Sequence, residues 1–223
     1  MLEEMAQFFE NRLTGYDAHM LTEIEGAAEF YSFTAAQLPS AARCAVLDLG
    51  CGTGLELETY FALNPSADIV GIDLSAGMLS ALRNKFPGKN LELVCGSYFD
   101  VPFGRERFHA AVSVESLHHF SAERKLSLYR KLYDSLKAGG WFILTDYFAE
   151  SEELEREYFE NLSWLKAEQG IADGKFYHYD TPLTVGHEIQ VLRSAGFSDC
   201  EILKNWGATY TVKASKNARS CIH

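Results

Sequence analysis

Residues 46–54 read VLDLGCGTG, an apolar segment that leads directly into glycines at every second position. An apolar run of this length is typical of a buried strand. Glycine lets the following chain turn sharply and lets a ligand touch the backbone. In a doubly wound sheet, ligands bind beyond the carboxyl ends of the strands, where a strand turns into its helix. The stretch therefore predicts a ligand site at the end of a central strand.

The rest of the chain alternates short apolar strands with helices. The strands predicted for the first part of the sheet are 45–49, 69–72, 91–95, 110–114 and 141–145. The alternation predicts a mostly parallel sheet covered by helices on both faces. A helix that begins at Ser121 is predicted to stop at Gly139 and Gly140. Segments 201–205 and 209–213 flank a WGA turn, which predicts a terminal antiparallel hairpin.

Composition narrows the class of protein. The 223 residues are enough for one sizeable core, and their composition is that of an ordinary soluble domain. No apolar run reaches the roughly 18 residues of a membrane span, so no membrane association is predicted. The formal charge of −11 disfavours a nucleic-acid partner, because such a surface repels phosphate backbones. The five scattered cysteines show no metal-ligand spacing and favour a reducing, cytoplasmic location.

An acidic residue ends the second predicted strand and points to a nucleoside. Asp73 follows Gly54 by nineteen residues, and a carboxylate there can accept hydrogen bonds from both ribose hydroxyls. The dinucleotide fingerprint G-x-G-x-x-G/A would require glycine or alanine at Leu55. The glycines are instead Gly50, Gly52 and Gly54. This spacing favours a nucleoside that carries an amino acid over a dinucleotide pyrophosphate.

Five stretches in order along the chain carry a family resemblance: VLDLGCGTG, GIDLS, GSYFD, AVSVESLHHF and LKAGGWFILTDY. Together they resemble the class I S-adenosylmethionine-dependent methyltransferases of the small-molecule type, strongly over residues 45–147. The resemblance implies an α/β, doubly wound, Rossmann-like fold. Its seven-stranded sheet would be mostly parallel, with an antiparallel C-terminal hairpin and a helical cap.

The resemblance also implies how the chain is divided. Residues 1–223 would form a single methyltransferase domain. The predicted parts are an N-terminal helical cap at 1–40, a cofactor-binding core at 41–146, a cap or substrate insertion at 147–182, and a C-terminal helix and hairpin at 183–223.

The cofactor implied by the resemblance is S-adenosyl-L-methionine. The residues implied to contact it are Tyr16, Asp48, Gly50, Cys51, Gly52, Gly54, Asp73, Leu74, Met78, Ser97, Tyr98, Val114, Glu115 and Ser116. Asp73 would bind the ribose, the glycine turn the methionine part, and Leu74 and Met78 the adenine. Ser97 departs from the acidic residue that the family usually places there.

Catalysis by such a protein consists mainly of alignment. Transfer from a sulfonium is an in-line displacement, so the protein orients the reactants and excludes water. A general base is needed only if the acceptor loses a proton. Glu115 and His119 are the catalytic candidates, and the alternative for His119 is a positioning role over the cofactor. Adjacent histidines seldom chelate one ion from a strand end, so no metal is predicted.

The sequence predicts a methyltransferase that acts on a small-molecule acceptor. Two aromatic-rich segments, the N-terminal helices and residues 147–182, are predicted to close over the cofactor and build the acceptor pocket. Alternatives remain open: a cofactor-binding protein that transfers another group or none, and a nicotinamide-dependent oxidoreductase. The acceptor and the oligomeric state are left open.

Overall fold

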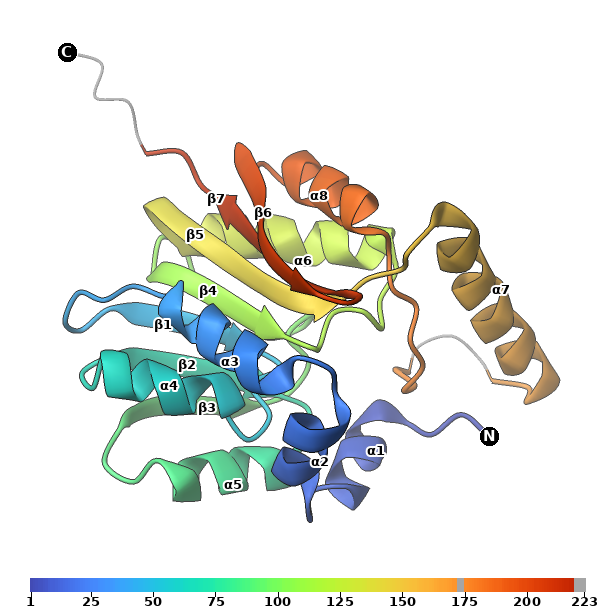
Figure 1. Cartoon of the computed structure of the whole chain (residues 1–223), viewed down its shortest axis with the longest axis horizontal. Helices are drawn as coiled ribbons and strands as arrows, with labels where there is room; N and C mark the ends of the chain where they lie inside the picture. Colours follow the sequence, from blue (N-terminus) through green and yellow to red (C-terminus); the bar gives the residue numbers. More distant parts are fainter. Residues whose placement is uncertain (172–174, 219–223) are drawn as a thin grey trace.

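The computed structural model describes residues 1–171 and 175–218. Within these residues a seven-stranded sheet runs in the order β3-β2-β1-β4-β5-β7-β6 (Figure 1). The strands are β1 (Ala45–Leu49), β2 (Asp68–Asp73), β3 (Asn90–Cys95), β4 (Phe108–Val114), β5 (Leu136–Tyr147), β6 (Asp199–Trp206) and β7 (Thr209–Ser215). β1 to β5 pair in parallel, and β7 is antiparallel to both β5 and β6. The predicted sheet and its terminal hairpin are confirmed.

Helices cover both faces of this sheet (Figure 1). They are α1 (Met5–Asn11), α2 (Tyr16–Glu23), α3 (Ala27–Ala36), α4 (Leu55–Leu63), α5 (Ala76–Lys85), α6 (Ala122–Ser135), α7 (Glu152–Glu168) and α8 (Val185–Ser194). Successive residues of a strand point to opposite faces, and β1 shows this. Val46 belongs to the buried cluster that includes residues of α3 and α4, whereas Leu47 and Leu49 belong to the cluster that includes residues of α6 and α8. The sheet is therefore buried on both sides, and its carboxyl edge is left for the site.

One boundary was predicted wrongly. α6 ends at Ser135, because Leu136 already has extended backbone angles (φ −76°, ψ 142°). Gly139 and Gly140 lie inside β5, where its pairing with β4 shifts register. A Cβ on Gly140 would lie 2.8 Å from the carbonyl oxygen of His109. The glycine pair therefore allows the register shift between β4 and β5, and it does not end the helix.

The segments outside the sheet core differ in how closely they pack. α1 and α2 lie beside the amino end of α5, whereas α7 stands apart from the sheet (Figure 1). Every residue of α7 is described, and none is buried. Among the described residues, no helix is both long and apolar enough to cross a membrane.

Candidate cofactor and acceptor site

A small cavity of about 50 Å³ lies beyond the carboxyl ends of β1, β2 and β4. It is lined by Met5, Phe9, Tyr16, Gly50, Gly52, Asp73, Leu74, Met78, Tyr98, Val114, Glu115 and Ser116. All of these except Met5 and Phe9 were predicted as cofactor contacts. Met5 and Phe9 come from α1, which carries no motif. We call this space the cofactor cavity.

The glycine turn is held in place by Asp73. The Gly50 and Cys51 amides donate to the carbonyl oxygen of Ile72, at 2.8 and 3.3 Å, and fix the turn against β2. The Gly52 amide donates to Oδ2 of Asp73 at 2.9 Å, and the Ser75 amide donates to Oδ1 at 2.8 Å. Burial raises the pKa of Asp73, although these bonds oppose the shift. The carboxylate therefore joins the turn to the start of α5.

Four predicted contacts do not line the cofactor cavity: Asp48, Cys51, Gly54 and Ser97. Cys51 is buried against Gly71, and burial raises the pKa of its thiol well above the usual range. The Ser97 hydroxyl accepts a hydrogen bond from a backbone amide two residues on. These residues support the turn and the neighbouring loop without lining the cavity.

Beneath the turn, Asp48 and Glu56 form a buried acidic pair. Burial and the nearby Glu56 carboxyl raise the pKa of Asp48, and burial likewise raises the pKa of Glu56. Among the described residues, Oδ2 of Asp48 and Oε1 of Glu56 find no hydrogen-bond partner. The region below the turn is therefore suited to a cationic group.

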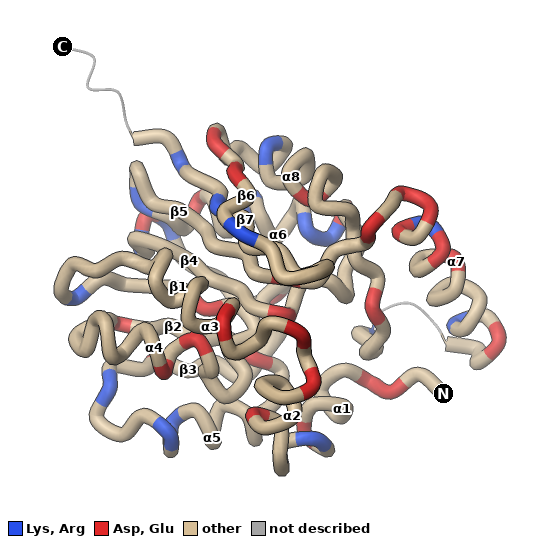
Figure 2. The backbone as a smooth tube through the Cα atoms, in the orientation of Figure 1, with Lys and Arg blue, Asp and Glu red and all other residues tan. Residues whose placement is uncertain are grey.

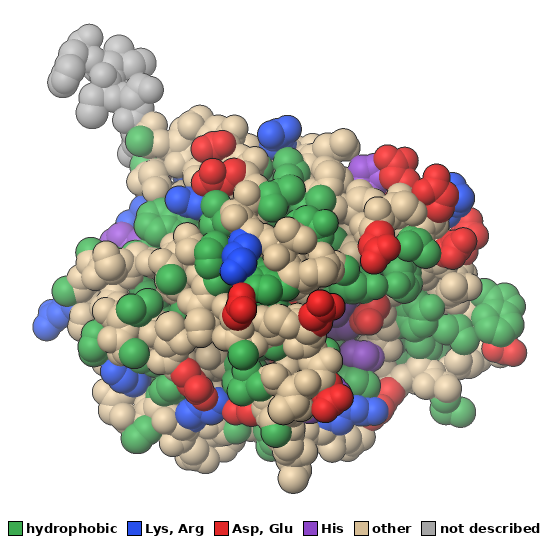
Figure 3. All heavy atoms as spheres, viewed as in Figure 1, with side chains coloured by type: hydrophobic (Ala, Val, Ile, Leu, Met, Phe, Trp, Pro, Cys, Tyr) green, Lys and Arg blue, Asp and Glu red, His purple; other side chains and the backbone are tan. Residues whose placement is uncertain are grey.

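A larger cavity of about 680 Å³ adjoins the first. Its walls come from α1, α2, the ends of β4, β5 and β7, and the loop that precedes α8. It is lined by Phe8, Phe9, Asn11, Arg12, Thr14, Gly15, Tyr16, His19, Met20, Ile24, Glu115, His118, His119, Tyr147, His178, Asp180 and Thr209. Figure 3 shows histidine and acidic side chains together in a hollow on this face. Phe9, Tyr16 and Glu115 line both cavities. We call the larger one the acceptor cavity.

Glu115 occupies a strained position on the shared wall. It follows β4 with φ 48°, a left-handed angle that is uncommon for residues other than glycine. Its amide donates to the carbonyl oxygen of Thr145, and its Oε1 accepts from the Thr209 hydroxyl at 3.0 Å. Burial, followed by the charge of Asp146, raises the pKa of Glu115 to about 7. Backbone strain of this kind clusters at functional sites.

His118 and His119 form a charged cluster with two aspartates. His118 Nδ1 contacts Oδ1 of Asp146, and its Nε2 lies 3.5 Å from Oδ1 of Asp180. His119 Nδ1 lies 3.1 Å from the same Asp180 oxygen. Burial opposes a charge on His118, but Asp146 and then Asp180 raise its pKa well above the usual range. Burial, and then His118, lower the pKa of His119.

Asp180 was not predicted as a site residue, although its loop was. Burial would raise the pKa of Asp180, but the His118 and His119 rings beside its carboxylate lower it overall. Two residues earlier, the His178 ring stacks on Phe8 with 3.4 Å between ring centroids. Burial and then His119 lower the pKa of His178 to about 4. The loop therefore brings both a carboxylate and a neutral ring to the acceptor cavity.

Hydrogen bonds on two sides hold the N-terminal segment over the cofactor cavity. The Met5 amide donates to the carbonyl oxygen of Phe176 at 2.9 Å, and the His178 amide donates to that of Glu3 at 3.0 Å. On the other side, Glu10 accepts from the hydroxyl of Ser75 at 2.6 Å. These contacts join α1 to both the α5 start and the loop before α8. They close one side of the cofactor cavity.

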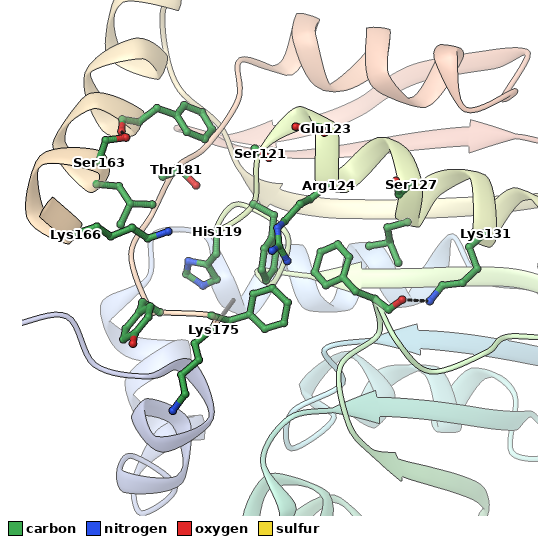
Figure 4. A pocket seen from close by; sticks show the side chains of 17 residues that line it. His119, Ser121, Glu123, Arg124, Ser127, Lys131, Ser163, Lys166, Lys175 and Thr181 are labelled. Carbon is green, nitrogen blue, oxygen red and sulfur yellow. Dashed lines mark hydrogen bonds between the residues drawn. The ribbon is translucent and has the colours of Figure 1, made fainter. Parts of the chain in front are cut away.

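A third cavity, of about 700 Å³, is also lined by His119. Side chains from α6 and α7 face one another across it (Figure 4). Lys131 lies at one end, but its ammonium donates to the carbonyl oxygens of Tyr98 and Phe99 at 2.6 and 2.8 Å. Lys175 lies at another and pairs with Glu4 at 2.9 Å. Since these cations have protein partners, we assign no ligand to this cavity.

Comparisons with known proteins agree with this geometry. The family described as a methyltransferase domain matches residues 46–140. A tRNA (carboxymethyluridine(34)-5-O)-methyltransferase from Saccharomyces cerevisiae is 31% identical over 117 residues, covering 52% of this chain and 40% of the yeast protein. A carboxy-S-adenosyl-L-methionine synthase from Nautilia profundicola is 25% identical, covering 77% of this chain and 76% of that protein. The chain thus spans less than half of the yeast relative.

Solved structures share the fold at low identity. Human N-acetylserotonin methyltransferase in complex with S-adenosylmethionine superimposes with a TM-score of 0.62 and 18% identity. The match covers 96% of this chain and 56% of the human protein. The strand order, the glycine turn with Asp73 and the matching family domain all agree. Residues 46–140 thus match the methyltransferase domain family, and the fold of the chain is the one that solved methyltransferases of the S-adenosylmethionine-dependent class share.

Proposed function

We propose that the chain transfers the methyl group of S-adenosylmethionine to a small molecule bound in the acceptor cavity. The observation that carries the proposal is the wall of Phe9, Tyr16 and Glu115 that the two cavities share. A methyl group presented at this wall would pass directly from one cavity to the other. The acceptor cavity measures about 680 Å³. Small-molecule sites typically measure about 300–1,000 Å³.

The residues of the cofactor cavity suit each part of S-adenosylmethionine. Asp73 would accept hydrogen bonds from the ribose hydroxyls, and Leu74 and Met78 would flank the adenine. The bare backbone of Gly50 and Gly52 would contact the methionine part. The acidic pair beneath the turn complements the positive charge of the ammonium and sulfonium groups. These roles are our assignments for residues on the cavity wall, except for the acidic pair, which lies beneath the turn and outside the cavity lining.

Surface charge favours a small acceptor over tRNA. Acidic residues lie along α7 and around α2 and α3 (Figure 2). These helices are next to the segments that enclose the acceptor cavity. The whole chain carries a formal charge of −11. Affinity for a nucleic acid depends largely on cations that neutralise phosphates. A surface with this excess of negative charge offers few cations to neutralise the phosphates of a tRNA.

A second candidate is synthesis of carboxy-S-adenosylmethionine, favoured by the length of the match. One synthase, from Helicobacter hepaticus, matches 96% of this chain and 92% of its own length at 25% identity. Such a product places a carboxylate beside the sulfonium. Here, however, the shared wall presents the carboxyl group of Glu115. A second negative charge at this point would be repelled, so we rank methyl transfer first.

The decisive experiment uses S-adenosylmethionine labelled in its methyl group. The chain is incubated with a small-molecule extract in one reaction and with bulk tRNA in another. We expect the label to enter a compound of low molecular mass and the cofactor to become S-adenosylhomocysteine. Label in tRNA would contradict the proposed acceptor, and a carboxylated cofactor would establish the second candidate. If calorimetry detects cofactor binding but no group is transferred, the chain is a binding protein.

Replacing Asp73 tests the ribose assignment. We expect Asp73→Ala to weaken binding of S-adenosylmethionine by about 10–150-fold, because hydrogen bonds to a charged group contribute about 1.5–3 kcal/mol. Calorimetry measures the dissociation constant. The matched control is Asp68→Ala at the opposite end of β2, where the carboxylate accepts from Asn90 at 2.9 Å. Equal affinities in the folded Asp73 and Asp68 variants would contradict the assignment.

Cofactor entry is expected to require movement of the cap. We propose that residues 1–40 and 147–182 form this cap around the core at 41–146; residues 172–174 of the second segment lie outside the described residues. The cofactor cavity of about 50 Å³ is far below the usual size of a ligand site, so α1 and the loop at 176–178 must separate. In hydrogen exchange, we expect S-adenosylmethionine to slow exchange at residues 5–11 and 176–178. Residues 55–63 of α4 serve as the internal reference. Unchanged rates in both segments would show that the cap does not move.

A further inference from the structure

We propose that His118, His119 and Asp180 form a binding site for a divalent transition metal on the wall of the acceptor cavity. The ligand set of two imidazoles and one carboxylate is one that Zn²⁺ uses in catalytic sites, with a further position left open. One ligand atom from each residue lies within 4.8 Å of the others. The proposal reverses the expectation from sequence that the histidine pair holds no metal.

The distances between these atoms suit one tetrahedral ion. Oδ1 of Asp180 lies 3.5 Å from Nε2 of His118 and 3.1 Å from Nδ1 of His119. Ligands bound to zinc at about 2.0–2.2 Å with tetrahedral angles are separated by about 3.3–3.6 Å. Both distances from Asp180 to the imidazoles are therefore close to those that a shared ion requires, and the two imidazole ligand atoms lie within 4.8 Å of each other.

The surroundings of His118 resemble the support of a metal ligand. Its Nδ1 contacts Oδ1 of Asp146, and the Leu117 amide fixes the other Asp146 oxygen at 2.8 Å. A carboxylate on one imidazole nitrogen orients the ring and makes the opposite nitrogen a better ligand. The opposite nitrogen, Nε2, is the one that faces Asp180.

The carboxylate of Asp180 is partly buried in the protein and partly exposed to the cavity. Its side chain is 46% exposed, yet Oδ1 is buried and makes no hydrogen bond of good geometry with the described residues. His119 Nδ1 instead lies 3.3 Å from the carbonyl oxygen of Tyr179. Binding of a metal would exchange this contact for a bond to the ion. All three proposed ligands line the acceptor cavity, so the open coordination position would face a bound acceptor.

The role of the ion in the reaction rests on the proposed function. A bound zinc ion makes a coordinated hydroxyl more acidic and can orient it. The acceptor would then be a molecule with a hydroxyl group, which loses its proton to Glu115. Its oxygen forms the new bond to the methyl carbon as the carbon–sulfur bond breaks, and the neutral thioether leaves. The ion and Glu115 would thus act on one oxygen from two sides.

Metal binding is tested separately from turnover. The untagged chain is stripped with a chelator and titrated with Zn²⁺ by calorimetry and with Co²⁺ by absorption spectroscopy. We expect one equivalent to bind, with the cobalt spectrum of nitrogen and oxygen ligands and without a thiolate charge-transfer band. Asp180→Asn and His119→Gln should each weaken binding by more than about 100-fold, beyond the loss typical of outer-shell changes.

The control is a histidine that also sits beside carboxylates. His187 Nδ1 lies 2.9 Å from Glu155, and its Nε2 lies 3.6 Å from Glu152. His187→Gln should bind zinc as the unmodified chain does. If the unmodified chain takes up no ion, or if the Asp180 and His119 variants match it, the cluster is an ion pair and the proposal is wrong. Affinity for S-adenosylmethionine, measured on each variant, shows whether the cofactor site survives independently.

Discussion

Gly52→Val is expected to abolish measurable binding of S-adenosylmethionine while the chain stays folded. Gly52 lines the cofactor cavity, and a Cβ built on it meets no atom within 4 Å. The added side chain would therefore enter the space that we assign to the cofactor. Overpacking by a branched side chain costs about 1–3 kcal/mol, and the cofactor would also lose its approach to the backbone, so we expect a loss of about 100-fold or more.

A second glycine separates this steric effect from backbone strain. Gly52 has φ 47°, so valine also adds left-handed strain of about 1–2 kcal/mol to the folded state. Gly88 has φ 79° and equally open space around a Cβ, but it does not line either cavity. Gly88→Val should therefore lose similar stability in thermal unfolding and keep its cofactor affinity. Normal binding by a folded Gly52→Val chain would overturn the assignment of the turn.

The parallel part of the fold could be predicted because its signals are local. β1 is buried on both faces, so it appears in the sequence as an apolar run, interrupted only by Asp48, that leads into the glycine turn. The start of β5 was missed for the opposite reason. Gly139 and Gly140 are ordinary helix-stop residues, and their role in the strand depends on the carbonyl of His109 in the neighbouring strand. A contact of this kind leaves no local pattern.

The parts of the site also differ in whether local sequence signals or contacts between distant segments place them. Gly52 lies in the turn after β1 and Asp73 ends β2, so the topology of the sheet places them together. Met5 and Phe9 come from α1, whose position depends on hydrogen bonds to a loop more than 160 residues away. Asp180 lies in an aromatic loop that was predicted to touch substrate. The available signal was the run of polar and aromatic residues in that loop, but it could not identify Asp180 as the partner of His118.

The largest effect on turnover is expected at Glu115. Glu115→Gln should lower the rate of methyl transfer by about 10²–10⁴-fold, the usual contribution of a general base. Glu115 lines both cavities, whereas His119 lines the acceptor cavity but not the cofactor cavity. Of the two candidates, Glu115 is therefore better placed to take a proton from an acceptor that faces the methyl group.

Glutamine removes the proton acceptor but keeps the shape of the wall. Its amide oxygen can still accept from the Thr209 hydroxyl, which now bonds Glu115 Oε1 at 3.0 Å. The dissociation constant of S-adenosylmethionine should therefore change little, while transfer of labelled methyl to the extract falls steeply. Tyr16→Phe serves as the comparison, because Tyr16 lies on the same shared wall and burial raises the pKa of its hydroxyl too far for it to act as a base. Its transfer rate should fall far less. If Glu115→Gln turns over as fast as Tyr16→Phe, the acceptor needs no base at this position, and its methylated atom carries no proton that must be lost.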